Sequence, residues 1–209
     1  DFASLPMPLV LTTVATFVFW LRFRVPIALA VVALGLFAAA VVYSASNGSR
    51  PETLRDFFEL SAEGGFAWLT LALGIGTFVA AMAFDMSDPH RVTRRAANGF
   101  WLHVIAAPAL VNTVALSLLM GETGTNTALL IAFLTVIALV AIVIDRRSFL
   151  ITGVGYVVAV GATLGDGTGV AMTILILGIA LLLLGAFWER IRGAVLRVAG
   201  PMLPLNRLP

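Results

Sequence analysis

The chain contains no cysteine, which excludes disulfides, thiolate metal sites and cysteine nucleophiles. It also contains no lysine, because all 13 of its Lys and Arg residues are arginine. A retinal protein is therefore excluded, since its Schiff base needs an intramembrane lysine. Two histidines are present, His90 and His103. They are too few for a zinc site, and with His90 in a loop they do not suit a bis-histidine haem.

Motifs for catalysis are also missing. The sequence has no Gly-rich phosphate loop, no HExxH motif and no nucleophile elbow. The sequence suggests no acid and base that would pair in one place. The middle of each apolar stretch is free of Asp, Glu and Arg, whereas coupled pumps usually place carboxylates there. We therefore expect no enzyme activity, no cofactor, no metal and no proton- or sodium-driven transport of the familiar kind.

Charged residues are scarce, at 11% of the chain against 60% hydrophobic residues, and the mean hydropathy is +1.04. Soluble domains carry roughly 25% charged residues. The composition predicts an all-α polytopic transmembrane helix bundle in one domain, residues 1–189, with an amphipathic cytoplasmic tail at 190–209. Stretches long enough to span a bilayer are expected at Leu5–Leu21, Val25–Tyr43, Phe66–Phe84, Asn98–Met120, Thr127–Ile144, Phe149–Leu164 and Gly169–Trp188.

The arginines alternate between the two sets of predicted loops. Eleven fall in one set and in the C-terminal tail, and only Arg50 and Arg55 fall in the other. The positive-inside rule therefore predicts an external N-terminus and a cytoplasmic C-terminus. The sequence pI of about 9.9 then reflects topology, and no nucleic-acid partner is expected.

A basic segment, SDPHRVTRR, precedes the fourth stretch. We expect Ser87 to cap a helix that starts at Asp88 and Pro89. In that helix Arg91, Arg94 and Arg95 would share one face. Such a cluster attracts anionic lipid headgroups, and Arg190 and Arg197 of the tail are expected to do the same. Plain topology anchoring is the alternative role.

Polar residues inside the fourth stretch form a candidate buried site that comprises Trp101, His103, Pro108 and Asn112. His103 and Asn112 are nine residues apart and should face opposite sides of a helix. Pro108 should kink the helix and free a carbonyl. His103 should point into the bundle, because an unpaired ring nitrogen in hydrocarbon is costly. The expected partners are the hydroxyls of Thr12, Thr13, Thr16, Thr77 and Tyr156.

Two local features suggest further organisation. The first and fifth stretches end in similar arginine-containing turns, LRFRV and DRRSF, so a parallel repeat of residues 1–120 and 127–189 is possible. The longest loop holds Ser49 and Glu52, which fit a capping box. A short helix carrying Leu54, Phe57 and Phe58 on one face is expected to follow on the outer membrane surface.

The segments FDMSDPHRVTRRAANGFWLHVIAAP and GAFWERIRGAVLRVAGPMLPLNRLP resemble a family of uncharacterised bacterial multi-pass inner-membrane proteins. The resemblance implies an inner-membrane location and brings no catalytic or ligand residue with it. Two functions remain open. One is a non-catalytic membrane module, such as a scaffold, sensor or complex subunit that binds lipid or partner helices and that could form a homo-oligomer. The other is a transporter or channel with a pathway beside the fourth stretch.

Overall fold

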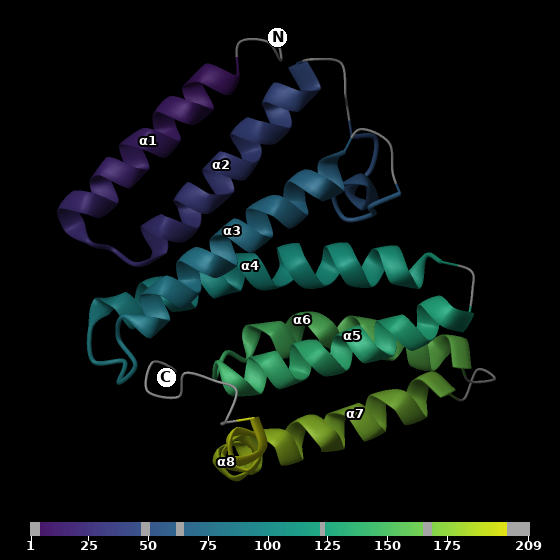
Figure 1. Ribbon diagram of the computed structural model, residues 1–209. Helices are drawn as coiled ribbons and strands as arrows, with labels where there is room; N and C mark the ends of the chain where they lie inside the picture. The colour runs from purple at the N-terminus through teal and green to yellow at the C-terminus, as the bar shows by residue number, and fades with distance from the viewer. Residues whose placement is uncertain (1–4, 47–50, 62–64, 122–123, 165–168, 200–209) are drawn as a thin grey trace. The chain divides into compact units, whose positions relative to one another are not determined.

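The computed structural model describes residues 5–46, 51–61, 65–121, 124–164 and 169–199. The described residues form eight α-helices and one short 3₁₀ helix, η2, and Figure 1 shows the α-helices in chain order. The elements are α1 (Pro6–Phe23), α2 (Ile27–Ser46), η2 (Leu54–Phe57), α3 (Phe66–Met86), α4 (Arg94–Leu119), α5 (Gly124–Val143), α6 (Ser148–Leu164), α7 (Gly169–Ala186) and α8 (Trp188–Ala199).

All seven predicted apolar stretches are helical, which confirms the all-α class. Five helices, α1 to α5, are long and apolar enough to cross a bilayer, and a sixth span is counted if α7 and α8 form one broken span. The helix α6 is apolar but shorter. The chain is thus a multi-pass integral membrane protein with five to six candidate spans among its described residues, against the seven predicted.

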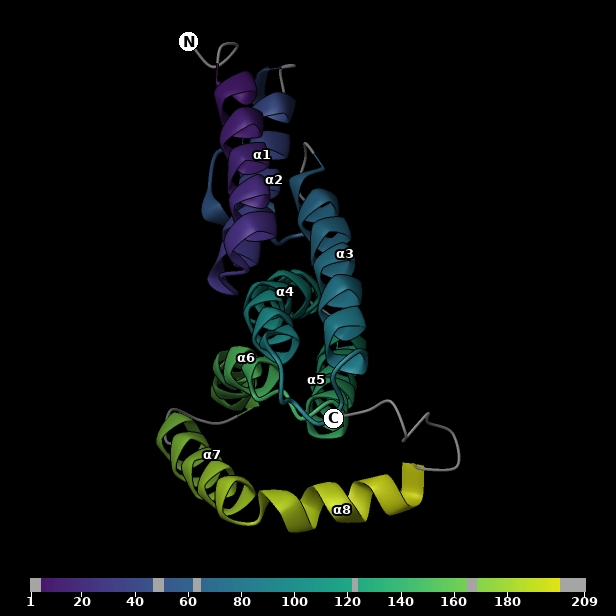
Figure 2. The ribbon, with the colours of Figure 1, turned by 90° about the vertical axis from the view of Figure 1, so that its left-hand side faces the viewer.

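The C-terminal helices differ from the prediction. The last predicted stretch reached Trp188, but α7 ends at Ala186 and α8 starts at Trp188 after a bend of 81°. Figure 2 shows the two helices meeting at this bend. The helix α8 carries apolar residues on one side and arginines on the other, as expected for a helix at a membrane surface. The tail beyond Ala199, including Arg207, lies outside the described residues.

The chain divides into two compact units, Asp1–Ser117 and Leu118–Leu208. In the first unit, α1 packs along α2, and α2 along α3. A buried cluster of Trp20, Ala28, Leu29, Ala81 and Leu102 joins α1, α2, α3 and α4. Small residues allow close approach, since a Cβ at Gly74 would lie 3.0 Å from the Ala109 Cβ. Such packing replaces the hydrophobic effect as the driving force between helices in lipid.

The long loop of the first unit is fixed by polar contacts. A capping box forms between Thr53 and Asp56 at the start of η2, while the predicted cap Ser49 lies outside the described residues. The element is one 3₁₀ turn and not the expected surface α-helix. Its Phe57 ring packs between Phe37 and Phe66, at centroid distances of 5.9 and 5.7 Å.

The second unit comprises α5 to α8. The turn after α5 places Asp145 in the left-handed region, with φ 55°, and its carboxylate accepts a 2.7 Å hydrogen bond from the Trp188 indole. Arg147 stacks over the same indole at 4.8 Å. Arg192 donates to the carbonyls of Ile142 and Val143 at the end of α5. These contacts hold α8 against the α5–α6 turn.

Candidate functional site

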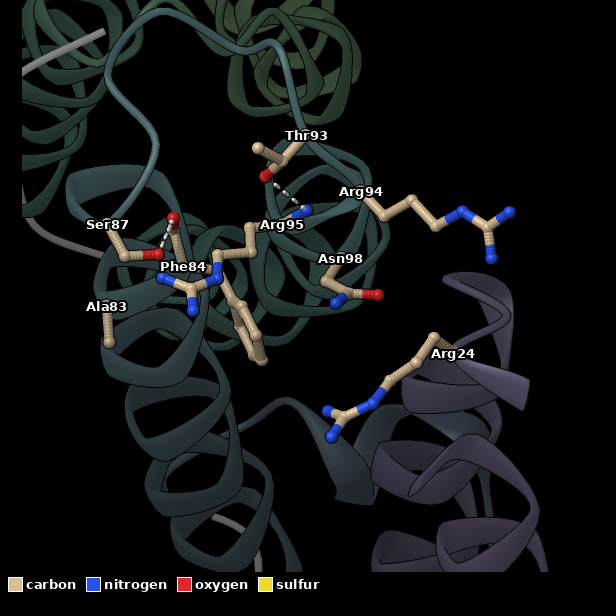
Figure 3. A pocket seen from close by; sticks show the side chains of 8 residues that line it. All are labelled: Arg24, Ala83, Phe84, Ser87, Thr93, Arg94, Arg95 and Asn98. Carbon is tan, nitrogen blue, oxygen red and sulfur yellow. Dashed lines mark hydrogen bonds between the residues drawn. The ribbon is translucent and has the colours of Figure 1, made fainter. Parts of the chain in front are cut away.

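A cavity of about 550 Å³ lies at one end of the first unit, where the α1–α2 turn meets the α3–α4 loop. We call it the arginine pocket. It is lined by Arg24, Ala83, Phe84, Ser87, Thr93, Arg94, Arg95 and Asn98. Figure 3 shows the Asn98 amide between the Arg24 and Arg94 side chains, while Arg95 reaches toward Ser87 and Phe84 of α3. This lining holds three guanidinium groups and no carboxylate.

The turn after α1 brings Arg24 to the arginine pocket. Arg24 has φ 54° and closes α1 by donating its backbone N–H to the Trp20 carbonyl at 2.7 Å. Its guanidinium stacks over the Trp20 ring at 4.8 Å, a cation–π contact. The Trp20 indole in turn donates to the Asn98 amide oxygen, at 3.4 Å. A chain of contacts therefore connects α1, the turn and α4 at one wall of the pocket.

The N-terminus of α4 also lines the pocket, and Thr93 caps it through a 3.1 Å bond from the Arg95 N–H to the Thr93 hydroxyl. The Asp88 carboxylate accepts from the backbone N–H groups of Val92 and Thr93 and from the Thr93 hydroxyl. The Thr93 hydroxyl bond, together with these N–H groups, lowers the pKa of the Asp88 carboxyl below its usual value. The lowered pKa of Asp88 stabilises the folded protein at pH values above the unfolded-state pKa of about 3.9. This stabilisation is lost as the pH falls through the lower folded pKa.

Two expectations about this segment are wrong. Ser87 does not cap a following helix, because it is the C-cap residue of α3 and its hydroxyl donates to the Phe84 carbonyl at 2.7 Å. Arg91 does not share a helical face with Arg94 and Arg95. It precedes α4 and has φ 53°, and it is not among the residues that line the arginine pocket. The third arginine that lines the pocket is Arg24, which is 70 residues before Arg94 in the sequence.

Thr93→Ala should lower the free energy of unfolding by about 1 kcal/mol, the usual effect of losing an N-cap. Ser87→Ala is the matched control, and it should have a smaller effect because Ser87 is exposed and bonds only within the end of its own helix. Denaturant unfolding in detergent micelles measures both variants. A larger loss for Ser87→Ala would place the cap at the position first expected from the sequence.

Behind the arginine pocket lies a buried pair of titratable side chains. The His103 Nε2 atom is 3.0 Å from the Asp85 Oδ2 atom. The two side chains are 0% and 1% exposed. The Phe78 ring meets the imidazole edge-to-face at 5.5 Å. His103 therefore points into the bundle, as predicted.

The partner of His103 was not predicted. Asp85 is the penultimate residue of α3, whereas the predicted span ended at Phe84 and left the carboxylate in a loop. The hydroxyls of Thr12, Thr13 and Thr16 each bond to the carbonyl four residues earlier in α1. Gly99 makes room for the carboxylate, since a Cβ there would lie 2.2 Å from the Asp85 Oδ1 atom. In the sequence, Gly99 lies four residues before His103, and this small residue on the same helix face was the signal that could have indicated a side chain packed beside His103.

The other predicted site residues of α4 do not join this pair. Trp101 is half-buried and packs edge-to-face on Phe100 at 5.5 Å. Asn112 is half-buried, nine residues further along α4 than His103. Pro108 lies within α4, which continues past it to Leu119.

Pro108 lines a groove of about 160 Å³ between α2, α3 and α4. Its walls are mainly apolar, with Phe37, Phe58 and Leu73 among them, and the Thr70 and Thr77 hydroxyls are its polar side-chain groups. The Thr70 hydroxyl donates to the Phe66 carbonyl.

The predicted tail arginines lie on α8. Arg190 stacks over the Phe187 ring at 5.6 Å, and the Arg197 Nε atom donates to the Gly193 carbonyl at 3.2 Å. Both side chains are exposed. In the described part of the chain, no group of three or more His, Asp or Glu residues could hold a metal ion.

Comparison with known proteins identifies no relative: no family model, no curated protein and no solved structure matches the chain.

Proposed function

We propose that the protein is a non-catalytic membrane module that binds the phosphate headgroup of an anionic phospholipid in the arginine pocket. The observation that supports this proposal is the pocket's lining of three exposed arginines with no carboxylate. A guanidinium presents a planar fork of donors that matches phosphate oxygens. The Asn98 amide NH₂ group adds an uncharged donor to the lining.

The position of the pocket suits a lipid better than a soluble anion. Arg24 follows α1, Ser87 follows α3 and Arg94 begins α4, so the pocket lies at the ends of three candidate spans. Phe84 and Ala83 supply an apolar wall beside the guanidinium groups. A phospholipid combines an anionic headgroup with acyl chains, and this pocket offers surface for both.

Topology and location are part of the proposal. The arginine distribution supports a cytoplasmic location at a bacterial inner membrane for the pocket, the α5–α6 turn and α8, and an external N-terminus. Arg190 and Arg197 would then contribute general attraction to the anionic surface. A homo-oligomer or a partner membrane subunit would pack on the apolar faces of the spans.

Transport beside Pro108 is the alternative function. A water or ion pathway needs polar groups to replace hydration. The groove beside Pro108 offers two threonine hydroxyls, of which Thr70 bonds to its own helix. We therefore favour lipid binding over transport.

Replacing the three pocket arginines together, Arg24→Gln, Arg94→Gln and Arg95→Gln, should weaken lipid binding about 100-fold, at roughly 1 kcal/mol for each arginine. The probe is a short-chain phosphatidylglycerol titrated into the detergent-solubilised protein at low salt, with phosphatidylcholine as the uncharged reference. Native mass spectrometry counts the bound lipid. Wild-type affinity in the triple variant would overturn the proposal.

Two single variants separate the arginine pocket from a general basic cluster. Arg24→Gln should weaken binding about fivefold, since about 1 kcal/mol is lost. Arg91→Gln, the matched control, should change affinity less than about twofold because Arg91 does not line the pocket. Equal losses in both variants would favour diffuse surface attraction over a defined site.

A further inference from the structure

We propose that Asp85 and His103 form a proton-binding site inside the helical bundle, which takes up and releases one proton. Their side chains are in contact at 3.0 Å and nearly fully buried. They come from different helices, α3 and α4, and are 18 residues apart in the chain. An ionisable side chain within a membrane helix most often has a function, because burying it is costly.

Stability alone does not account for two titratable groups at this contact. Other buried hydroxyls in the first unit satisfy themselves locally, as Thr13, Thr70 and Thr113 do by donating to the carbonyl four residues earlier. Burying an ion pair costs desolvation energy, and replacing such a pair by apolar side chains often leaves a protein equally stable. A carboxylate facing an imidazole differs from those hydroxyls because both groups can gain or lose a proton.

The proton balance follows from the contact. The Nε2–H group of His103 donates to the Asp85 carboxylate in both states. The exchanging proton therefore binds at the Nδ1 atom, where it converts the imidazole to imidazolium. Uptake from water changes the pair from a net charge of −1 to a neutral carboxylate–imidazolium pair. Release returns the proton to water and needs no other reactant.

The proposed route between the pair and water is the neighbouring arginine pocket. Asp85 is flanked in the chain by Phe84 and lies two residues before Ser87, and both of these line the cavity. Across the contact, Asn98 lines the cavity and the next residue, Gly99, has the Asp85 carboxylate as its nearest side-chain neighbour. Asp85 and Gly99 are thus each next in the chain to a residue that lines a cavity of about 550 Å³.

The charges that act on the pair come from each neighbouring element. Within α3, Asp85 is the only charged residue, and α2 has no Asp, Glu, Arg or His. The α1–α2 segment contributes Arg22 and Arg24, the α3–α4 loop contributes Asp88, His90 and Arg91, and α4 contributes Arg94 and Arg95.

Nuclear magnetic resonance of ring-labelled histidine tests the proposal directly, because the chain has only two histidines. His90 is exposed in the loop and serves as an internal control. In a pH titration of the folded protein we expect the His103 ring signals to change from imidazole to imidazolium. The carboxyl carbon signal of labelled Asp85 should change over the same pH range, as in coupled titrations. The variant His90→Gln assigns the His103 signals.

Variants of the pair supply the second readout. In His103→Gln, the pH-dependent change of the Asp85 signal should disappear, and the chain should take up one proton fewer than wild type over the same titration. His90→Gln should leave the Asp85 change intact. A purely structural pair would keep constant His103 signals throughout the titration, and that result in wild-type protein would overturn the proposal.

Discussion

His103→Leu is expected to lower the free energy of unfolding by about 3 kcal/mol, because it leaves the Asp85 carboxylate buried without its partner. The sequence alone suggests about 1 kcal/mol for an interhelical hydrogen bond in a membrane. The larger effect follows from the identity of the partner, since Asp85 is a carboxylate that is 1% exposed. The expected loss of free energy is at the lower end of the range for a broken buried ion pair. Asp85 lies near the end of α3, where its side chain can move toward water.

A double variant provides the control for this prediction. Adding Asp85→Asn to His103→Leu removes the buried charge and should restore about 2 kcal/mol. Denaturant unfolding in detergent micelles measures both proteins. If His103→Leu costs less than about 1 kcal/mol and Asp85→Asn restores nothing, the carboxylate is hydrated and the pair is not buried.

Gly99→Ala is expected to destabilise the protein by about 2 kcal/mol, as overpacking of a close contact does. The new Cβ would lie 2.2 Å from the Asp85 Oδ1 atom and 3.3 Å from the Ala81 carbonyl oxygen. The carboxylate cannot move aside without losing its bond to His103, and the carbonyl belongs to the backbone of α3. The helices α3 and α4 must therefore separate.

Gly76→Ala is the matched control, because a Cβ at Gly76 meets no atom within 4 Å. It should raise stability by up to about 1 kcal/mol, the helix-propensity gain of alanine over glycine. The thermal unfolding midpoints of the two variants should thus move in opposite directions. If both variants are stabilised, α3 and α4 do not approach each other at Gly99.

Much of the fold was predictable because the hydropathy along the sequence shows which stretches are long and apolar enough to form membrane helices. All seven predicted apolar stretches are helical. The boundaries were less accurate, by up to four residues at the start of α4. That error had a chemical consequence at α3, where a span ending at Phe84 left Asp85 in a loop and removed the true partner of His103 from consideration.

The arginine pocket was only half predictable. Arg94 and Arg95 were identified from local charge, but Arg24 was not associated with them. Hydropathy identifies the spans but does not show which spans are neighbours in the bundle. The sequence therefore could not show that the turn with Arg24 lies beside the loop before Arg94, 70 residues later. The arginine alternation predicts that both turns lie on the same side of the membrane, and this is the signal that could have suggested a shared site.

The contact between Asp85 and His103 also fixes the axial register of α3 and α4. A slip of α4 by one helical turn would move the His103 Nε2 atom about 5.4 Å along the helix axis, out of reach of the carboxylate. The same slip would bring Arg95 or His103 to the place of Gly99, where even a Cβ is 2.2 Å from the Asp85 Oδ1 atom. Apolar helix faces can shift along one another in lipid at little cost in free energy. The contact between Asp85 and His103, together with the close approach at Gly99, therefore favours the observed register of α3 and α4 over registers shifted by a turn.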